Sequence, residues 1–200
     1  MRILAVSGSL RERSYNRALL RAARELAPPG VDIEEFDLSQ LPFYDADVEA
    51  GGDPEPVAAL RAAVRDADAL LIATPEYNRG TSGVLKNAID WLSRPALASV
   101  LRWKPVAIMG ASTGRGGTRR AQQQVRDALL FPGAEVLEGP EVAVPIAWEK
   151  FDAEGRLVDE RTRAAVSNLL FALTEVASAD GSGLEPDRAA QDVPQSALVG

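Results

Sequence analysis

The chain has 200 residues, 46% of them hydrophobic, which is enough for one domain around a single core. Its formal net charge of −7 argues against a protein that binds nucleic acid or anionic lipid. Because it contains no cysteine and no histidine, disulfides, thiolate chemistry and a serine–histidine–aspartate triad are excluded, and no metal site is expected.

No apolar run is long enough to cross a membrane, and the first residues lack the apolar block and cleavage site of a signal peptide. We therefore expect a cytoplasmic protein that has no membrane or nucleic-acid partner.

The first predicted unit is a strand, residues 3–6, followed by a polar loop, residues 7–16, and an amphipathic helix. A loop in this position directs backbone N–H groups and the positive end of a helix dipole at one point, which suits phosphate. Further hydrogen bonds and a charge that matches phosphate geometry are available from Ser9, Ser14, Asn16 and Arg11. The same stretch also fits an ordinary turn in which Ser14 or Asn16 caps the helix.

The next elements are a partly exposed strand at residues 31–36 and a long acidic loop at residues 38–52. Asp53 followed by Pro54 predicts an N-cap and the first residue of another helix. The apolar run at residues 69–73 is typical of a central strand that is buried on both sides.

A second unusual loop, residues 74–81, follows this central strand. Pro75 keeps the backbone extended, and Glu76, Tyr77 and Asn78 place a carboxylate, an aromatic ring and an amide on one edge. Such a loop suits a flat heteroaromatic ligand, although a surface turn with a half-buried tyrosine explains the residues equally well. In the helix that follows, Lys86 and Asp90 are spaced for an ion pair, and Trp91 belongs to the core or to a subunit interface.

A third loop, Ser112 to Gly117, follows a strand at residues 105–109 and contains three glycines, which allow a ligand to approach the backbone closely. Arg115, Arg119 and Arg120 oppose the dipole of the next helix, which favours a bound anion. The glycines do not form the dinucleotide-binding pattern, and no Walker lysine is present, so a Rossmann domain and a P-loop ATPase are poor fits.

A last strand within residues 134–144 has a possible break at Gly139-Pro140, and a final helix covers residues 166–176. The alternation of strands and helices predicts a flavodoxin-like α/β three-layer sandwich, with a five-stranded parallel sheet in the order 2-1-3-4-5 and helices on both faces. In that order the three unusual loops lie together at the carboxyl edge. We expect one domain, residues 1–177, and a disordered tail, residues 178–200, which is rich in Gly, Pro and polar residues.

Three ordered motifs resemble the NADPH-dependent FMN reductase family, whose members include quinone, chromate and azo-dye reductases. They are Gly8-Ser9-Leu10-Arg11 with Ser14 and Asn16, then Pro75-Glu76-Tyr77-Asn78 with Gly80, and Leu85-Lys86-Asn87-Ala88-Ile89-Asp90-Trp91. Ser112, Gly114, Gly116-Gly117 and Arg119 agree with the same pattern, and the similarity covers about residues 1–177.

The resemblance implies bound FMN, with NADPH or NADH as electron donor and a small molecule as acceptor: a quinone, a free flavin, a metal oxyanion or an azo compound. It implies that phosphate and ribityl are bound by Ser9, Arg11, Ser14, Tyr15 and Asn16. It places the flavin ring against Pro75, Glu76, Tyr77 and Asn78, with Ser112 and Gly114 nearby. Donor and acceptor then use the same flavin face in turn, in ping-pong order, and no side chain is needed as a proton donor.

The family also implies a homodimer or homotetramer whose sites border a subunit interface. We expect the helix that carries Trp91, or the final helix, to pack against a partner, and residues 41–44 to contribute to the partner's pocket. Two other classes remain open: a flavodoxin-type electron carrier, and a sensing or binding module in which a flavin reports redox state. Rapid bleaching of the flavin by NADPH alone separates a reductase from an electron carrier, and slow turnover with every small acceptor beside a tight protein complex favours the sensing module.

Overall fold

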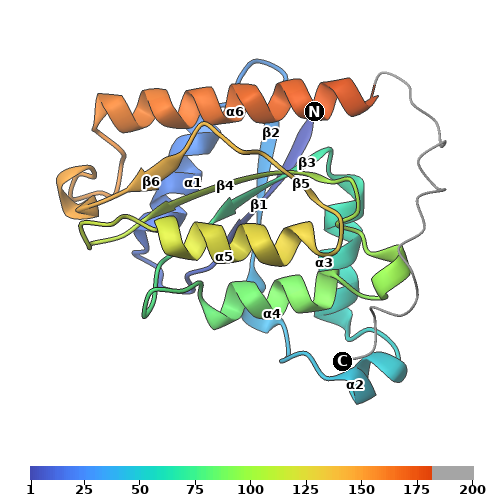
Figure 1. Ribbon diagram of the computed structural model, residues 1–200. Coiled ribbons are helices and arrows are strands. Elements are labelled where there is room, and N and C mark those ends of the chain that lie inside the picture. The colour runs from blue at the N-terminus through green and yellow to red at the C-terminus, as the bar shows by residue number, and fades with distance from the viewer. Residues whose placement is uncertain (182–200) are drawn as a thin grey trace.

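The computed structural model describes residues 1–181, which form a parallel sheet between two layers of helices (Figure 1). The strands are β1 (Arg2–Ser7), β2 (Asp32–Phe36), β3 (Ala69–Ala73), β4 (Pro105–Ala111), β5 (Glu135–Val136) and β6 (Val142–Val144). The helices are α1 (Tyr15–Glu25), α2 (Ala46–Ala50), α3 (Glu55–Asp66), α4 (Gly83–Leu92), α5 (Arg119–Leu130) and α6 (Glu160–Gly181). Short 3₁₀ turns are η1 (Leu38–Gln40), η2 (Ala96–Ala98) and η3 (Ala147–Glu149).

The strand order β2-β1-β3-β4-β5 confirms the predicted flavodoxin-like topology, and β6 also pairs with β4. The last predicted strand is indeed broken, because Val136 pairs with Val106 whereas Val142 pairs with Met109. Where the chain leaves the sheet, Arg126 of α5 donates to the carbonyl oxygens of Val136 at 3.2 Å and Leu137 at 2.6 Å. These bonds satisfy carbonyl groups at the point where the strand is interrupted.

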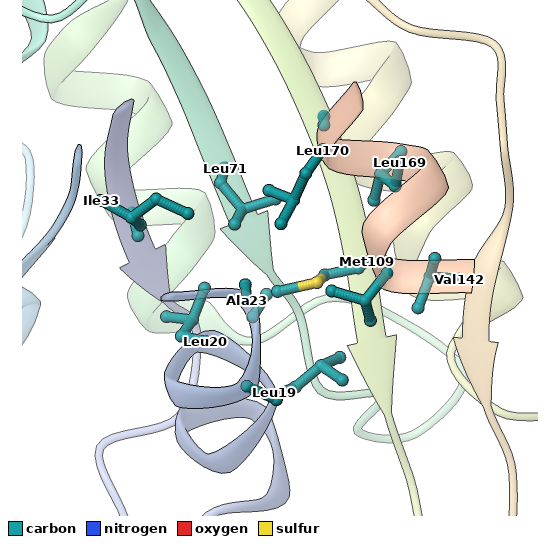
Figure 2. Close-up of a cluster of buried hydrophobic side chains, with 14 of the residues drawn as sticks. Leu19, Leu20, Ala23, Ile33, Leu71, Met109, Val142, Leu169 and Leu170 are labelled. Atoms are coloured by element: carbon teal, nitrogen blue, oxygen red, sulfur yellow. The ribbon is translucent and has the colours of Figure 1, made fainter. Parts of the chain in front are cut away.

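Alternate side chains of the central strands enter two separate cores, as expected for a sheet covered on both faces. On one face α1 and α6 pack on Leu71 and Met109, and Figure 2 shows this cluster. On the other face α3, α4 and α5 pack on Leu70 and Ile72. Helices therefore cover both faces of the sheet, and the loops that connect strands to helices lie at its edges.

The acidic loop is more ordered than its composition predicts, because it contains η1 and α2. The predicted capping role of Asp53 is wrong: α3 begins at Glu55 after Pro54, and it has no side-chain cap. The Asp53 carboxylate instead accepts hydrogen bonds from Arg61, which also donates to the carbonyl oxygen of Trp91 at 2.9 Å. Trp91 is fully buried, so of its two predicted locations the core is correct.

Helix α6 has 22 residues and runs to Gly181, so residues 178–181 belong to it and not to a tail. The rest of the expected tail, residues 182–200, lies outside the described residues. Among the helices of residues 1–181, none combines the length and the apolar character needed to cross a membrane.

The start of α6 is held by Asp159. Its carboxylate accepts hydrogen bonds from the Thr162 backbone N–H at 2.9 Å and hydroxyl at 2.6 Å, and pairs with Lys150 at 3.0 Å. The bonds from Thr162, followed by Lys150, lower the pKa of the Asp159 carboxyl from 3.8 to about 2. A folded-state pKa below the unfolded value means that the ionised carboxylate stabilises the fold.

We predict that this stabilisation is present above about pH 4 and is lost as the pH falls towards about 2. Asp159→Asn should lower the free energy of unfolding at pH 7 by about 1 kcal/mol, since the side chain is partly exposed and asparagine still caps a helix. Urea denaturation across this pH range measures both effects. Glu160→Gln is the matched control, because the Glu160 side chain is 90% exposed and should contribute little. Equal losses below pH 4 in wild type and Asp159→Asn would contradict the assignment.

Candidate functional site

The three unusual loops lie at one edge of the sheet. They follow β1, β3 and β4, which are neighbouring parallel strands, so their carboxyl ends meet. In Figure 1 this edge is on the left, where β4 and β6 end and α5 and α6 begin. The predicted convergence of the loops is confirmed, and the contacts between them can now be described.

The first and second loops touch directly. The Ser9 hydroxyl and the Tyr77 hydroxyl lie 3.5 Å apart, and the backbone N–H of Gly8 donates to the Ala73 carbonyl oxygen at 2.9 Å. A Cβ atom on Gly8 would lie only 2.9 Å from the Pro75 ring and 2.8 Å from the Ser82 hydroxyl. Only glycine fits at this position, so the close approach of the two loops depends on it.

Ser14 and Asn16 both have structural roles. The Ser14 hydroxyl accepts from the Asn16 backbone N–H at 3.1 Å and caps α1, as the alternative interpretation predicted. The Asn16 amide makes two bonds with the backbone of Ala111, one donated at 3.0 Å and one accepted at 2.9 Å. This buried amide holds the end of β4, so Asn16 positions the first loop, and its expected contact with a phosphate stays a prediction.

The first loop keeps a set of free donors. The backbone N–H groups of residues 10–13 make no hydrogen bond with any residue that the structure describes, and they lie just before the N-terminus of α1. Arg11 is exposed, with its guanidinium 6.0 Å from the centre of the Tyr15 ring. The Tyr15 ring packs in turn against the Phe151 ring, with the two ring centroids 5.3 Å apart. Donors, cation and helix dipole together form an anion-binding arrangement.

The second loop is a tight turn that exposes its tyrosine. Tyr77 and Gly80 exchange two backbone hydrogen bonds of 2.9 Å, and Asn78 and Arg79 between them have φ angles of 52° and 66°. Two consecutive positive φ angles are the mark of a type I′ turn, in which asparagine is favoured. The turn presents Tyr77 with 53% of its surface exposed, beside Ser9.

Glu76 does not lie free at the loop edge. Its carboxylate accepts from the backbone N–H groups of Arg120 at 3.1 Å and Ala121 at 3.4 Å, and its side chain is only 14% exposed. Helix α5 has no side-chain cap of its own at Thr118, so Glu76 caps it from the second loop. The anion that the helix N-terminus favours is therefore a residue of the chain itself, and the argument from the dipole for a bound anion no longer holds.

The cations of the third loop differ in their partners. Arg119 pairs with Glu141 at 2.8 Å, and Arg120 lies 3.9 Å from Glu76. Arg115 is exposed and makes no ion pair with any described residue. Of the local cationic cluster predicted from the sequence, Arg115 is the member available to an anionic ligand.

The third loop is held by a segment that the sequence analysis did not single out. Within the loop, the Gly114 N–H donates to the Ser112 hydroxyl at 3.0 Å. The N–H groups of Ile146 and Ala147 donate to the carbonyl oxygens of Gly114 and Ser112, at 3.2 Å and 3.0 Å. The apolar run after the last strand was the available signal, because a segment that follows β6 must lie at the same edge.

The chain also has a polar cleft of about 300 Å³ between α5 and the connection from β5 to β6. Among its lining residues, Gln122 and Arg126 donate to backbone carbonyl oxygens and Arg119 pairs with Glu141. Ser9, Arg11 and Tyr77 do not line it, so this cleft is not the candidate site.

We predict that Glu76→Ala lowers the free energy of unfolding by about 1–2 kcal/mol, because two N–H groups of α5 lose their acceptor. Glu76→Gln keeps an acceptor oxygen and should lose about half as much. Urea denaturation of the flavin-free protein measures the effect on the chain alone. Glu141→Gln is the control, since its pair with Arg119 is exposed. If Glu76→Ala is no worse than that control, Glu76 does not cap α5.

With this geometry established, comparisons with known proteins are informative. The family model for NADPH-dependent FMN reductases matches residues 1–149. An NAD(P)H-dependent FMN reductase of Pseudomonas aeruginosa is 50% identical over 173 residues, covering 86% of this chain and 93% of the relative. A 2-hydroxy-1,4-benzoquinone reductase of a Burkholderia species is 41% identical over 163 residues, covering 82% and 88%.

The solved structure of FerB, a flavoenzyme NAD(P)H:(acceptor) oxidoreductase from Paracoccus denitrificans, superposes with a TM-score of 0.80 at 32% identity. It covers 89% of this chain and 97% of FerB. Fold, loop arrangement, family match and relatives agree, and the chain therefore belongs to the NADPH-dependent FMN reductase family, whose members are flavin-dependent oxidoreductases.

Proposed function

We propose that this chain is an FMN-dependent oxidoreductase that takes electrons from NADPH or NADH and passes them to a small quinone. The observation that carries the proposal is the first loop, where the free N–H groups of residues 10–13 and the Arg11 side chain precede α1. Family membership supports the reductase over an electron carrier or a sensing module, since the matched relatives are enzymes.

The first loop fits the phosphate end of FMN. Four consecutive N–H groups that bond no described residue, a helix N-terminus and an exposed guanidinium are the donors that a terminal phosphate needs. Ser9 and Tyr15 border this set, and Ser14 and Asn16 hold its shape through the helix cap and the bonds to Ala111. This donor set supports FMN as the bound flavin.

The second and third loops fit a planar ring. Tyr77 offers apolar surface next to the buried Pro75, and the backbone N–H groups of Glu76 and Asn78 make no bond with other described residues. Ser112 and Gly114 belong to the third loop, which Ile146 and Ala147 hold in place by hydrogen bonds. Rigid loops with unpaired backbone donors can fix the edge of a heteroaromatic ring. The Glu76 carboxylate would support the ring site indirectly, because it holds the second loop against the N-terminus of α5.

A bound flavin supplies the redox chemistry, because it accepts a hydride from one substrate and gives electrons to another. The chain's own contribution is binding and orientation. With no histidine or cysteine in the sequence, no side chain of those types is available as acid, base or nucleophile. Donor and acceptor would then occupy the same exposed face in turn, which gives ping-pong kinetics.

The relatives support a quinone as the acceptor, since the Burkholderia protein is named as a reductase of a hydroxylated benzoquinone. The exposed Arg115 in the third loop supports NADPH as donor, because a guanidinium suits the additional phosphate. A cytoplasmic location, where reduced nicotinamides are plentiful, stays a prediction.

The oligomeric state belongs to the same proposal. Pro42 and Tyr44 are tied to α4 by three bonds: Asn87 to the Pro42 carbonyl oxygen, Trp91 to the same oxygen, and Tyr44 N–H to Asn87. Phe43 lies between them and is 84% exposed, and these bonds hold the backbone on both sides of it. A rigid, exposed aromatic side chain is typical of an interface, and we propose that residues 41–44 pack against a second copy near its flavin site.

We predict that the purified protein is yellow and releases FMN, not FAD, in a ratio of about one per chain. Mass spectrometry of the heat-released cofactor identifies it, and an anaerobic absorption spectrum after NADPH, then NADH, shows which donor bleaches the flavin. FAD, no flavin after reconstitution, or bleaching by neither donor would refute the proposal.

We also predict that Arg11→Ala raises the dissociation constant for FMN about tenfold to a hundredfold, while riboflavin, which has no phosphate, binds as it does to wild type.

For the interface, we predict that Phe43→Ser shifts a dimer towards monomer in sedimentation velocity and that activity per subunit falls on dilution. Phe131→Ser is the control, because Phe131 is 79% exposed at the end of α5, on the opposite edge of the sheet. A wild-type monomer with full specific activity would contradict the shared pocket.

A further inference from the structure

The segment from Ile146 to Phe151 begins at the third loop, which borders the proposed ring site. Its first two residues donate hydrogen bonds to Gly114 and Ser112, as described above, and thereby attach it to the third loop. It then continues to Lys150, which pairs with Asp159 at the start of α6. Both ends of this short segment are thus fixed, one to the binding loop and one to the core helix.

Its backbone is strained at one residue. Ile146 has φ 49° and ψ 51°, the left-handed conformation, which is rare for a β-branched side chain. Such a conformation is unfavourable and persists only where the surroundings impose it. Here the Ile146 N–H is bound by Gly114 and its carbonyl oxygen by Glu149, at 3.2 Å and 3.0 Å. Strain of this kind is concentrated at functional sites, and here it lies beside the third loop.

The consequence of this turn is that η3 buries its neighbours and exposes its indole. Ala147 is fully buried and Phe151 is 6% exposed, whereas Trp148 between them is 54% exposed. Tyr77, on the second loop of the same edge, is exposed to almost the same degree, 53%. Two large aromatic side chains therefore stand half exposed on rigid turns at the edge where the three loops meet.

We propose that Trp148 is a specificity-determining residue that forms an outer wall of the acceptor pocket and stacks on a planar quinone. An indole offers a large flat apolar surface, and offset stacking on a ring stabilises a bound aromatic acceptor. A small inorganic acceptor such as ferricyanide has no ring to stack and is indifferent to this wall. The proposal rests on the proposed function, and it assigns the preference for aromatic acceptors to one residue.

The test uses the holoenzyme with NADPH and two acceptors, 1,4-naphthoquinone and ferricyanide. Trp148→Ala should raise the KM for naphthoquinone by about threefold to tenfold, with kcat within about twofold and the KM for ferricyanide unchanged. Trp148→Phe keeps a ring and should recover most of the affinity. Trp103→Ala is the matched control, because Trp103 is 48% exposed but precedes β4 at the opposite edge of the sheet.

A second readout does not depend on turnover. Oxidised holoenzyme binds naphthoquinone without reducing it, so equilibrium dialysis gives a dissociation constant, which should rise in Trp148→Ala by the same factor as the KM. Equal changes for both acceptors, no change for either, or the same loss in Trp103→Ala would overturn the role of Trp148. Each of those outcomes is compatible with normal FMN content and normal bleaching by NADPH. If the wild-type protein lacked FMN or were not bleached by NADPH, the proposed function itself would be refuted.

Discussion

The pair of hydrogen bonds between the Asn16 amide and the backbone of Ala111 is the interaction on which the arrangement of the site depends. It joins the start of α1 to the end of β4, across the intervening end of β3. Because the amide is 3% exposed, loss of either partner would leave a buried polar group unsatisfied, which costs about 1–3 kcal/mol. The bonds fix the position of the first loop relative to the third, and the donors of residues 10–13 are positioned as a result.

The same principle applies to the second loop. Glu76 caps α5, and Gln124 of that helix accepts from the Thr81 N–H at 3.1 Å. Glu76 and Gln124 accept hydrogen bonds from backbone N–H groups that have no other acceptor among the described residues. Other N–H groups of the loops make no bond with a described residue. The site is thus built by satisfying some of the backbone groups at the sheet edge with side chains while others remain unpaired.

Electrostatics follows the same division. The chain is acidic overall, yet the cations near the three loops are not equivalent, since Arg119 and Arg120 have carboxylate partners and Arg11 and Arg115 make no ion pair with a described residue. Anionic parts of a cofactor or donor would meet the unpaired ones. An acidic surface with exposed cations on the three loops, Arg11 and Arg115 among them, discriminates against polyanions in general while it still admits a phosphate at defined points.

The sequence alone determined the strand order, the break at Gly139-Pro140 and the meeting of three loops, because periodicity and the rules for parallel sheets are local or topological. It also determined the family, since the motifs keep their order and spacing. Only the structure shows that Asn16 and Glu76, both expected at the ligand, hold backbone groups 95 and 44 residues away. Such partners depend on which loops tertiary packing brings together. For the same reason the sequence analysis did not single out the strained turn at Ile146 or the exposed Trp148: the place of this segment beside the third loop follows from β6 pairing with β4, which only the folded sheet creates.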